Sequence, residues 1–349
     1  MMPIETDALV IGAGPVGLYQ VFQLGLLEIR CHVVDALPYP GGQCIELYPD
    51  KPIYDIPGIP RTTGRALTDN LLAQIKPFDA TFHWSQVVRR IETLVDGRFQ
   101  VVTSQGQQFN TKVIIMAAGV GAFQPRLLKL AGLEKFENSQ LFYHNLPENT
   151  QGQHVLIVGG EDNALECAVR LATGPGASSL ARSVTLLHRR SVYQSGPELV
   201  AQAHALQCAK ALNVMVGQVT GFDEQATRLV SVQITDIDGL VQVMPVDTLL
   251  VYLGLSPKLG PIAEWGLVMD RKQVTVDTEK FGTSVSGIFA VGDINTYPGK
   301  KKLILSGFHE CALAAFGAAD IVFPGKNPQL EYTTSSTRLH RLLGRDGQT

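Results

Sequence analysis

Residues 8–17 read Ala8-Leu9-Val10-Ile11-Gly12-Ala13-Gly14-Pro15-Val16-Gly17. The four apolar residues predict a buried strand, the glycines predict a tight turn, and the residues after Pro15 predict a helix. Gly12, Gly14 and Gly17 have the spacing of a dinucleotide-binding fingerprint, in which the turn lets the backbone approach a pyrophosphate. The helix N-terminus supplies N–H donors and a positive dipole to the same phosphates. The stretch therefore predicts the start of a Rossmann-like unit.

A second stretch repeats this pattern with one change. The apolar run His154-Val155-Leu156-Ile157-Val158 precedes Gly159-Gly160-Glu161-Asp162-Asn163-Ala164. Gly159, Gly160 and Asn163 are the predicted contacts to a second nucleotide. Glu161 replaces the glycine that lets the backbone approach the pyrophosphate, and its carboxylate would repel that group. Two fingerprints in one chain indicate two bound nucleotides and electron transfer between them.

The residues that end the next strand differ between the two units. Asp35 ends the apolar strand 31–35, where an acid hydrogen-bonds a ribose 2′-OH. Arg189 and Arg190 follow the strand 184–187, and guanidinium groups favour a 2′-phosphate. We therefore predict FAD in the first site and NADPH in the second. A solvated acid and a solvated basic turn are the alternatives.

Further segments complete the predicted organisation. The apolar strand 287–291 leads into Gly292-Asp293, the place for an acid that contacts a flavin side chain. Residues 98–102 and 109–115 predict a hairpin, whereas residues 37–64 lack clear periodicity and form a long stretch of the kind that is often functional.

Composition excludes several classes of function. A length of 349 residues predicts about two domains, and a net charge of −3 argues against nucleic-acid binding. No leader precedes the first strand and no apolar run approaches the ~18 residues of a membrane span, so we expect a cytoplasmic location. The five cysteines form no C-x-x-C pair and no metal-type cluster, so we expect neither a redox dithiol nor a bound metal.

The motifs, taken in order, resemble those of the thioredoxin-reductase-like ferredoxin/flavodoxin–NADP⁺ reductases. The most specific segments are Gly41-Gly42-Gln43, the ranges 48–58, 119–126, 259–262, 265–267 and 297–300, and the strand that ends in Gly292-Asp293. The resemblance implies an α/β fold of two Rossmann-like domains, with the NADPH domain inserted in the FAD domain. Residues 1–121 and 287–349 would form the FAD-binding domain, and residues 122–286 the NADPH-binding domain.

The resemblance also implies roles for individual residues. Tyr48 would stack on one flavin face, and the C-terminal extension 332–337 would cover the other face, often across a homodimer. The resemblance adds no catalytic residue beyond the flavin. The full predicted FAD set is Gly12, Gly14, Pro15, Gly17, Asp35, Gln43, Tyr48, Phe123, Asp293 and Thr334, and the NADPH set is Gly159, Gly160, Asn163, Arg189 and Arg190.

Two departures separate the chain from related flavoproteins. Thioredoxin reductases carry a C-x-x-C that is missing here, and the glutathione-reductase type pairs two cysteines five apart, where this chain has Cys44 and Pro49. A disulfide reductase is therefore disfavoured. Gln194 stands where relatives often have a further arginine, which weakens the expected NADPH site.

The implied function is electron transfer from NADPH through FAD to ferredoxin or flavodoxin. Such carriers are acidic, and Lys300, Lys301 and Lys302 with Arg338, Arg341 and Arg345 would form a basic rim that steers them. A solvated turn is the plainer interpretation of the lysine triplet. Two other functions stay open: a reductase of a quinone or small molecule, and a flavin-binding protein in which Glu161 impairs nucleotide turnover.

Overall fold

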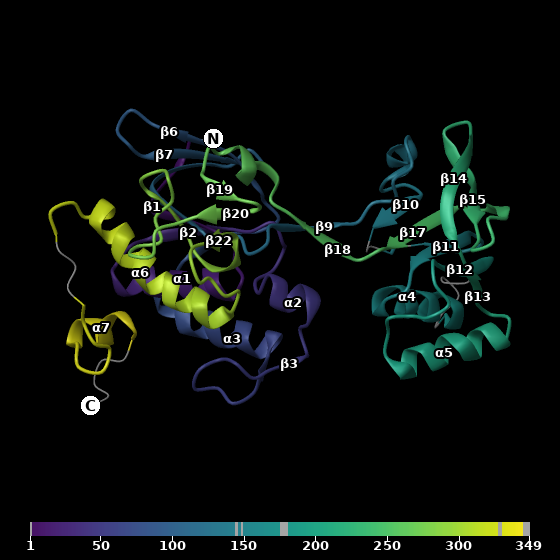
Figure 1. The fold of residues 1–349 in the computed structure, drawn as a ribbon, viewed down its shortest axis with the longest axis horizontal. Coiled ribbons are helices and arrows are strands. Elements are labelled where there is room, and N and C mark those ends of the chain that lie inside the picture. Colours follow the sequence, from purple (N-terminus) through teal and green to yellow (C-terminus); the bar gives the residue numbers. More distant parts are fainter. Residues whose placement is uncertain (1, 144–145, 148, 175–180, 327–329, 345–349) are drawn as a thin grey trace. The chain divides into compact units, whose positions relative to one another are not determined.

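The computed structural model describes residues 2–143, 146–147, 149–174, 181–326 and 330–344, and the chain forms two compact units (Figure 1). The first unit comprises Met1–Ala122 and Pro257–Thr349, and the second comprises Phe123–Ser256. The chain crosses through β9 (Ala122–Pro125) and returns through β18 (Leu255–Lys258), and these two strands pair.

The return to the first unit differs from the prediction. The sequence analysis places it at residue 287, thirty residues (287 − 257) later than the observed position. Residues 257–286 belong to the first unit because Leu267, Val274, Val276 and Phe281 are buried in its core. In addition β20 (Gln273–Thr275) pairs with β19 (Met269–Asp270) and with β22 (Asn295–Thr296), which follows the Gly292-Asp293 turn.

A seven-stranded sheet forms the centre of the first unit. The strands run in the order β5 (Thr81–His83), β2 (Cys31–Val34), β1 (Ile4–Ile11), β8 (Gln108–Met116), β7 (Phe99–Thr103) and β6 (Val88–Thr93), with β21 (Ile288–Ala290) also on β8. The pairs among β5, β2, β1, β8 and β21 are parallel. The predicted hairpin is the antiparallel pair of β7 and β8, and β6 extends it by antiparallel pairing with β7. The apolar runs form these strands because both faces of the parallel part are covered.

Helices cover this sheet. The helix α1 (Pro15–Leu26) packs against α3 (Gly64–Ile75) and α6 (Ile304–Val322). Smaller elements complete the unit: α2 (Gln43–Leu47), β3 (Pro52–Ile53), β4 (Thr62–Thr63), α7 (Thr337–Leu342) and the 3₁₀ turns η1 (Lys76–Phe78), η3 (Gly260–Glu264) and η4 (Gly292–Ile294). The parallel arrangement puts the carboxyl ends of β1, β2 and β21 at one edge, which is where nucleotides bind in such sheets.

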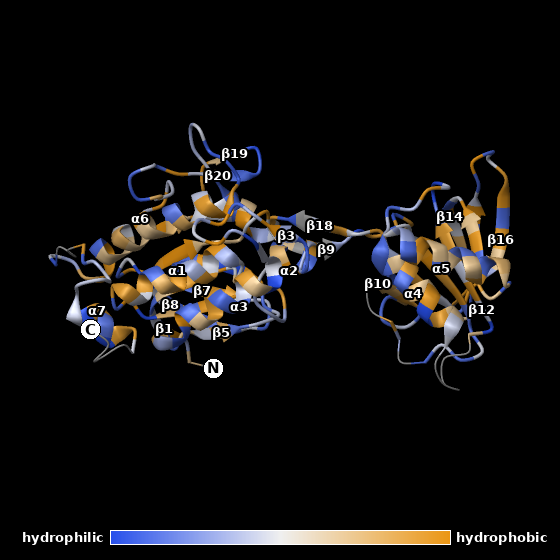
Figure 2. Cartoon of the chain, turned by 90° about the horizontal axis from the view of Figure 1, so that it is seen from below, coloured by the Kyte–Doolittle hydropathy of each residue, from blue (hydrophilic) through white to orange (hydrophobic). Residues whose placement is uncertain are grey.

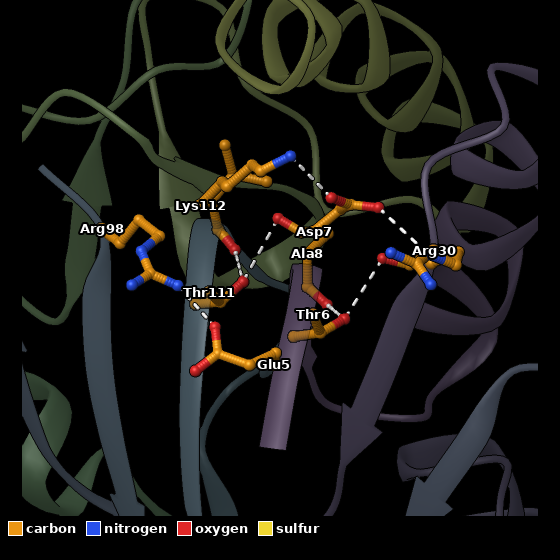
Figure 3. A network of polar contacts seen from close by, with 9 residues as sticks. Glu5, Thr6, Asp7, Ala8, Arg30, Arg98, Thr111 and Lys112 are labelled. Atoms are coloured by element: carbon orange, nitrogen blue, oxygen red, sulfur yellow. Dashed lines mark hydrogen bonds and ion pairs between the residues drawn. The ribbon is translucent and has the colours of Figure 1, made fainter. Parts of the chain in front are cut away.

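A network of polar side chains lies toward the other end of β1 (Figure 3). Lys112 Nζ donates to Asp7 Oδ1 at 2.8 Å, and Arg30 forms an ion pair with Asp7 Oδ2 at 3.4 Å. The Thr111 hydroxyl donates to the Asp7 carbonyl at 3.3 Å. These contacts join β1 to β8 and to the residue before β2, away from the glycine turn.

The helix α6 bears on the expectation that no apolar segment approaches membrane length. The helix has 19 residues with a mean hydropathy of 1.2 over an 18-residue window. Among the described residues it is therefore long and apolar enough to cross a membrane by length and composition. In this structure α6 packs on α1 and β8, and Ala314, Ala315 and Ala318 are fully buried. One such helix is weak evidence for a membrane span, because core helices pass the same test.

The second unit has a parallel sheet with a different cover on each face. Its order is β10 (Leu141–Tyr143), β17 (Thr248–Tyr252), β11 (His154–Gly159), β12 (Ser183–His188) and β13 (Asn213–Val216). One face packs on α4 (Asp162–Thr173) and α5 (Pro197–Cys208), which alternate hydrophobic and hydrophilic residues in Figure 2. The other face packs on the antiparallel strands β14 (Gln218–Gln225), β15 (Arg228–Thr235) and β16 (Val241–Pro245), near the turn η2 (Leu133–Phe136).

The period of two along β11 explains this double cover. Val155 and Ile157 belong to the cluster that holds the helices, whereas Leu156 and Val158 belong to the cluster that holds the antiparallel strands. Successive side chains of a strand point to opposite faces, so one continuous apolar run serves both cores.

Candidate functional site

The three glycines of the first turn lack a side chain for different structural reasons. A Cβ on Gly12 would lie 2.4 Å from the Ala117 carbonyl oxygen, and a Cβ on Gly17 would lie 1.9 Å from the Gly12 carbonyl oxygen. Both glycines are therefore required by the fold itself. A Cβ on Gly14 would lie 4.0 Å from its nearest neighbour, the Cα of Gly42. Gly14 is thus free of the protein's own packing, which leaves a ligand as the reason for its missing side chain.

A second pair of glycines lies against this turn. The Gly41 N–H donates to the Ala13 carbonyl at 2.9 Å, and a Cβ on Gly42 would lie 3.0 Å from the Gly14 Cα. Gly41 and Gly42 have φ values of 108° and 50°, a region that favours glycine. Gln43, half-buried, begins α2 directly after them. The two glycine segments form a side-chain-free cradle at the start of α1, where Pro15 is the first helical residue.

Asp35 lies beside this cradle. Its Oδ2 accepts from the Ala13 N–H at 2.5 Å and its Oδ1 accepts from the Leu37 N–H at 2.7 Å. Burial raises the pKa of Asp35, and the two backbone bonds oppose that rise because they favour the carboxylate. The acid is thus held in place at the edge where an adenosine ribose would follow the pyrophosphate.

Asp293 reaches the same edge from the far end of the sequence. It lies in η4, after β21, and burial raises its pKa while Lys300 and Lys302 oppose the rise. A Cβ on Gly292 or on Gly307 would contact the Val16 side chain at 3.2 or 2.4 Å. Val16 therefore packs where the starts of α1 and α6 meet the Asp293 turn. The start of α6 was missed by the sequence analysis, although Gly307 in an apolar helical pattern is a signal for it.

Tyr48 lines a cavity of about 550 Å³ in the first unit. The Tyr48 hydroxyl and the Cys44 thiol lie 3.5 Å apart, and burial raises the pKa of both groups. Cys44 is 2% exposed, so its thiol is protonated and enclosed rather than poised as a nucleophile. The cavity is lined by Tyr48, Lys51, Pro52, Ile53, Tyr54, Asp55, Lys302, Leu303 and Ile304.

The turn of the second unit differs from the first because Glu161 replaces the second glycine of the fingerprint. A Cβ on Gly159 would lie 2.5 Å from the Tyr252 carbonyl oxygen, and one on Gly160 would lie 2.4 Å from the His188 ring. Glu161 is the exposed N-cap residue of α4 and makes no capping hydrogen bond. Its Oε2 lies 3.4 Å from the position of a Cβ on Gly254, so the carboxylate lies over the carboxyl end of β17. Asn163, the second helical residue, is exposed.

Arg189 and Arg190 lie at the same edge of the second unit. They are exposed and follow β12, which pairs in parallel with β11. The Arg190 carbonyl lies 2.9 Å from His188 Nδ1. Asp162 Oδ1 accepts from the Ser195 hydroxyl at 2.6 Å and from the Gly196 N–H at 3.2 Å, which ties the segment after the arginines to the start of α4.

Other predicted residues fall elsewhere. Thr334 is exposed in the segment before α7, whose Arg338 forms an ion pair with Glu28 at 2.6 Å, at the C-terminal end of α1. That end is about 18 Å from the glycine turn, because α1 has 12 residues that rise ~1.5 Å each. Arg338, four residues after Thr334, is therefore held at the end of α1 away from the glycine turn, and the flavin contact of Thr334 stays a prediction. The side chain of Phe123 lies outside the described residues.

The predicted basic rim is wrong in one of its members. The Lys300 side chain is 5% exposed and pairs with the buried Glu310. Arg338 is partly exposed and pairs with Glu331 and Glu28. Lys301, Lys302 and Arg341 are exposed, whereas Arg345 lies outside the described residues. Among the residues that the structure describes, no three His, Cys, Asp or Glu side chains gather as metal ligands would.

Two glycine turns at the carboxyl ends of two parallel sheets define a protein with two dinucleotide-binding units. The chain belongs to the pyridine nucleotide-disulphide oxidoreductase family, whose model matches residues 6–307. It is 60% identical over 344 residues to the ferredoxin–NADP reductase of a Polaromonas species, which covers 98% of this chain and 93% of that protein. The family resemblance inferred from the motifs is thereby confirmed.

Solved structures confirm the predicted fold class. The thioredoxin reductase of Lactococcus lactis matches with a TM-score of 0.56 at 23% identity, over 91% of this chain and 99% of that one. The bacillithiol disulfide reductase of Staphylococcus aureus matches with a TM-score of 0.60 at 15% identity, over 90% of this chain and 98% of that one. At these identities the likeness concerns the fold alone.

Proposed function

We propose that this chain is an FAD-containing oxidoreductase that passes electrons from NADPH to ferredoxin. The observation that carries the proposal is the contrast between the two turns. Gly14 leaves bare backbone beside the buried acid Asp35, whereas Arg189 and Arg190 stand exposed at the other turn. The first set suits a ribose with a free 2′-OH, as in FAD, and the second suits a 2′-phosphate, as in NADPH. The 60% identical relative, named ferredoxin–NADP reductase, supports the choice of acceptor.

The residues of the first unit fit FAD. The cradle of Gly14 and Gly42 with the N-terminus of α1 would hold the pyrophosphate, Asp35 would bond the adenosine ribose, and Asp293 would bond the flavin side chain. Tyr48 would cover one ring face and exclude water from it. Bound FAD supplies the conversion of a two-electron hydride into single electrons.

The role of the protein is to bind and orient the two nucleotides, and none of its side chains needs to form a covalent bond. The second unit would hold NADPH by Gly159, Gly160, Asn163 and the two arginines. Flavodoxin as an alternative acceptor, a cytoplasmic location, and a homodimer in which Thr334 reaches the partner's flavin are parts of the same proposal. The exposure of Thr334 before α7 is compatible with such a contact to a second copy.

The test is anaerobic reduction of the purified protein. We expect a yellow protein whose flavin absorption is bleached by NADPH faster than by NADH, followed by reduction of added ferredoxin. A chain that neither contains FAD nor takes it up would refute the proposal. Fast turnover with a quinone and none with ferredoxin or flavodoxin would show instead that the chain is a reductase of a quinone or small molecule.

A disulfide reductase is the second enzyme class that must be distinguished from the proposed ferredoxin reductase. All five cysteines are free, and Cys31, Cys44, Cys167 and Cys311 are buried. Replacing the five by alanine or serine should leave NADPH-dependent ferredoxin reduction intact, with a stability loss of about 1 kcal/mol at each buried site. Melting temperature is measured alongside turnover. Loss of turnover on Cys44→Ser alone, in a folded and FAD-loaded protein, would require a thiol mechanism instead.

A further inference from the structure

Glu310 and Lys300 form a buried ion pair directly behind the Asp293 turn. Glu310 lies on the second turn of α6 with its side chain 0% exposed, and Lys300 Nζ donates to its Oε1. The sequence analysis treated Lys300 as part of a solvent-exposed rim and gave Glu310 no role. Neither residue takes part in the nucleotide contacts proposed above.

The pair holds the peptide groups on both sides of Gly292. The Gly292 N–H donates to Glu310 Oε2 at 2.7 Å, and Lys300 Nζ donates to the Gly292 carbonyl at 3.0 Å. Gly292 has a φ of 78°, and the Val16 side chain lies against it. The carbonyl that Lys300 holds belongs to the peptide bond that joins Gly292 to Asp293.

Two further side chains complete the shell of Glu310. Asn295 Nδ2 donates to Glu310 Oε2 at 2.8 Å and also to the Ala290 carbonyl at 2.8 Å, and the Tyr297 hydroxyl donates to Oε1 at 3.0 Å. Glu310 therefore accepts from four groups that all lie between Gly292 and Lys300. This one carboxylate on α6 thus fixes the position of residues 292–300, which follow β21.

A buried ion pair is weak evidence for stability, because desolvation of the two charges offsets their attraction. Its effect is geometric: each of the donors must take one position to satisfy the carboxylate. The segment that is held in this way carries Asp293, the predicted contact to the flavin side chain. These contacts thus connect Glu310 in α6 to the orientation of Asp293 in the candidate site.

We propose that Glu310, with Lys300, is a positioning residue for FAD binding, because it holds the Gly292–Asp293 peptide so that Asp293 faces the flavin side chain. The inference rests on the proposed function, since it requires FAD in the first unit. Burial raises the pKa of Asp293, Lys300 and Lys302 oppose that rise, and the charge of Glu310 adds to it, so the proposal rests on the hydrogen-bond geometry.

The experiment is a double-mutant cycle on FAD affinity. Apo-protein is prepared from the wild type, Glu310→Gln, Asp293→Asn and the double variant, and each is titrated with FAD while its apo melting temperature is recorded. Glu310→Gln keeps the shape but presents an amide to Lys300, and it should weaken FAD binding about ten- to a hundredfold. In the Asp293→Asn background the same change should cost much less, since Glu310 acts through Asp293.

Asp7→Asn is the matched control (Figure 3). It also disrupts an ion pair on a largely buried acid of the first unit, in the half of β1 away from the glycine turn. It should change FAD affinity by no more than about twofold. If Glu310→Gln does not fold, Lys300→Gln enters the same cycle with the same expected non-additivity.

Three outcomes overturn the inference. They are wild-type FAD affinity in folded Glu310→Gln, losses that add fully with those of Asp293→Asn, and an equal loss in Asp7→Asn. A wild-type apo-protein that fails to bind FAD refutes the proposed function itself, whereas normal wild-type binding with additive losses refutes the positioning role alone.

Discussion

The two glycine turns share a chain path but present opposite surfaces to a nucleotide. In the first unit the Cβ position of Gly14 is open, and the neighbouring acid, Asp35, is buried and bonded to two backbone N–H groups. In the second unit Glu161 takes the corresponding place, and the charged groups Arg189 and Arg190 are exposed. The comparison teaches that one local fold can present two different surfaces, one with bare backbone beside a fixed acid, the other with exposed charges.

This difference matches the proposed division between a retained cofactor and an exchanging substrate. A cradle whose acid is already fixed binds without the entropy loss of ordering it, which favours tight retention. Exposed arginines lose their mobility only on binding, and Glu161 opposes the phosphates. An open, weaker site is suited to a nucleotide that must leave after each turnover.

The largest expected effect concerns Gly14. Gly14→Val should fold, since its Cβ position is open, but should weaken FAD binding by about a hundred- to ten-thousandfold through loss of charge-assisted phosphate contacts. The measurement is the flavin-to-protein ratio of the purified protein with its circular dichroism. Gly12→Val is the control that should fail to fold, because a Cβ there lies 2.4 Å from a carbonyl oxygen. A yellow, fully loaded Gly14→Val protein would contradict the FAD assignment.

The next effect concerns the nucleotide of the second unit. Arg189→Ala or Arg190→Ala should each weaken NADPH binding about ten- to a hundredfold and leave NADH binding unchanged, because NADH lacks the 2′-phosphate. Steady-state kinetics with both nucleotides measure this. Arg182→Ala, an exposed arginine just before β12, is the matched control. Equal losses for NADPH and NADH would mean that the arginines do not bind the phosphate.

The smallest effect is a gain. Glu161→Gln removes a charge from the start of α4 at almost constant size, and should tighten NADPH binding about two- to fivefold at low salt, as expected for an exposed charge. Added salt should shrink the gain, because it screens the repulsion. Glu166→Gln, exposed further along α4, is the control. Weaker binding in Glu161→Gln would show that the carboxylate serves as a ligand, for instance to a ribose hydroxyl.

Local sequence was enough for the elements that carry the two turns. The strands around Val10 and Ile157 and the turns after them were predicted because their signals are local: an apolar run, glycines at fixed spacing and a helix start. The family resemblance, the fold class and the insertion of one unit in the other also followed from motifs and their order. These features depend on residue types at short separation, which a single sequence displays directly.

The tertiary structure decided what depends on distant partners. Lys300 has the sequence context of a solvated turn, and only the fold of α6 brings Glu310 to it and removes it from the surface. The return at residue 257 depends on core contacts such as those of Val274. The position of α7 beside α1 depends on the ion pair of Arg338 with Glu28, 310 residues away. The charge and size of a residue are written in the sequence, but its burial and its partner are properties of the packed chain.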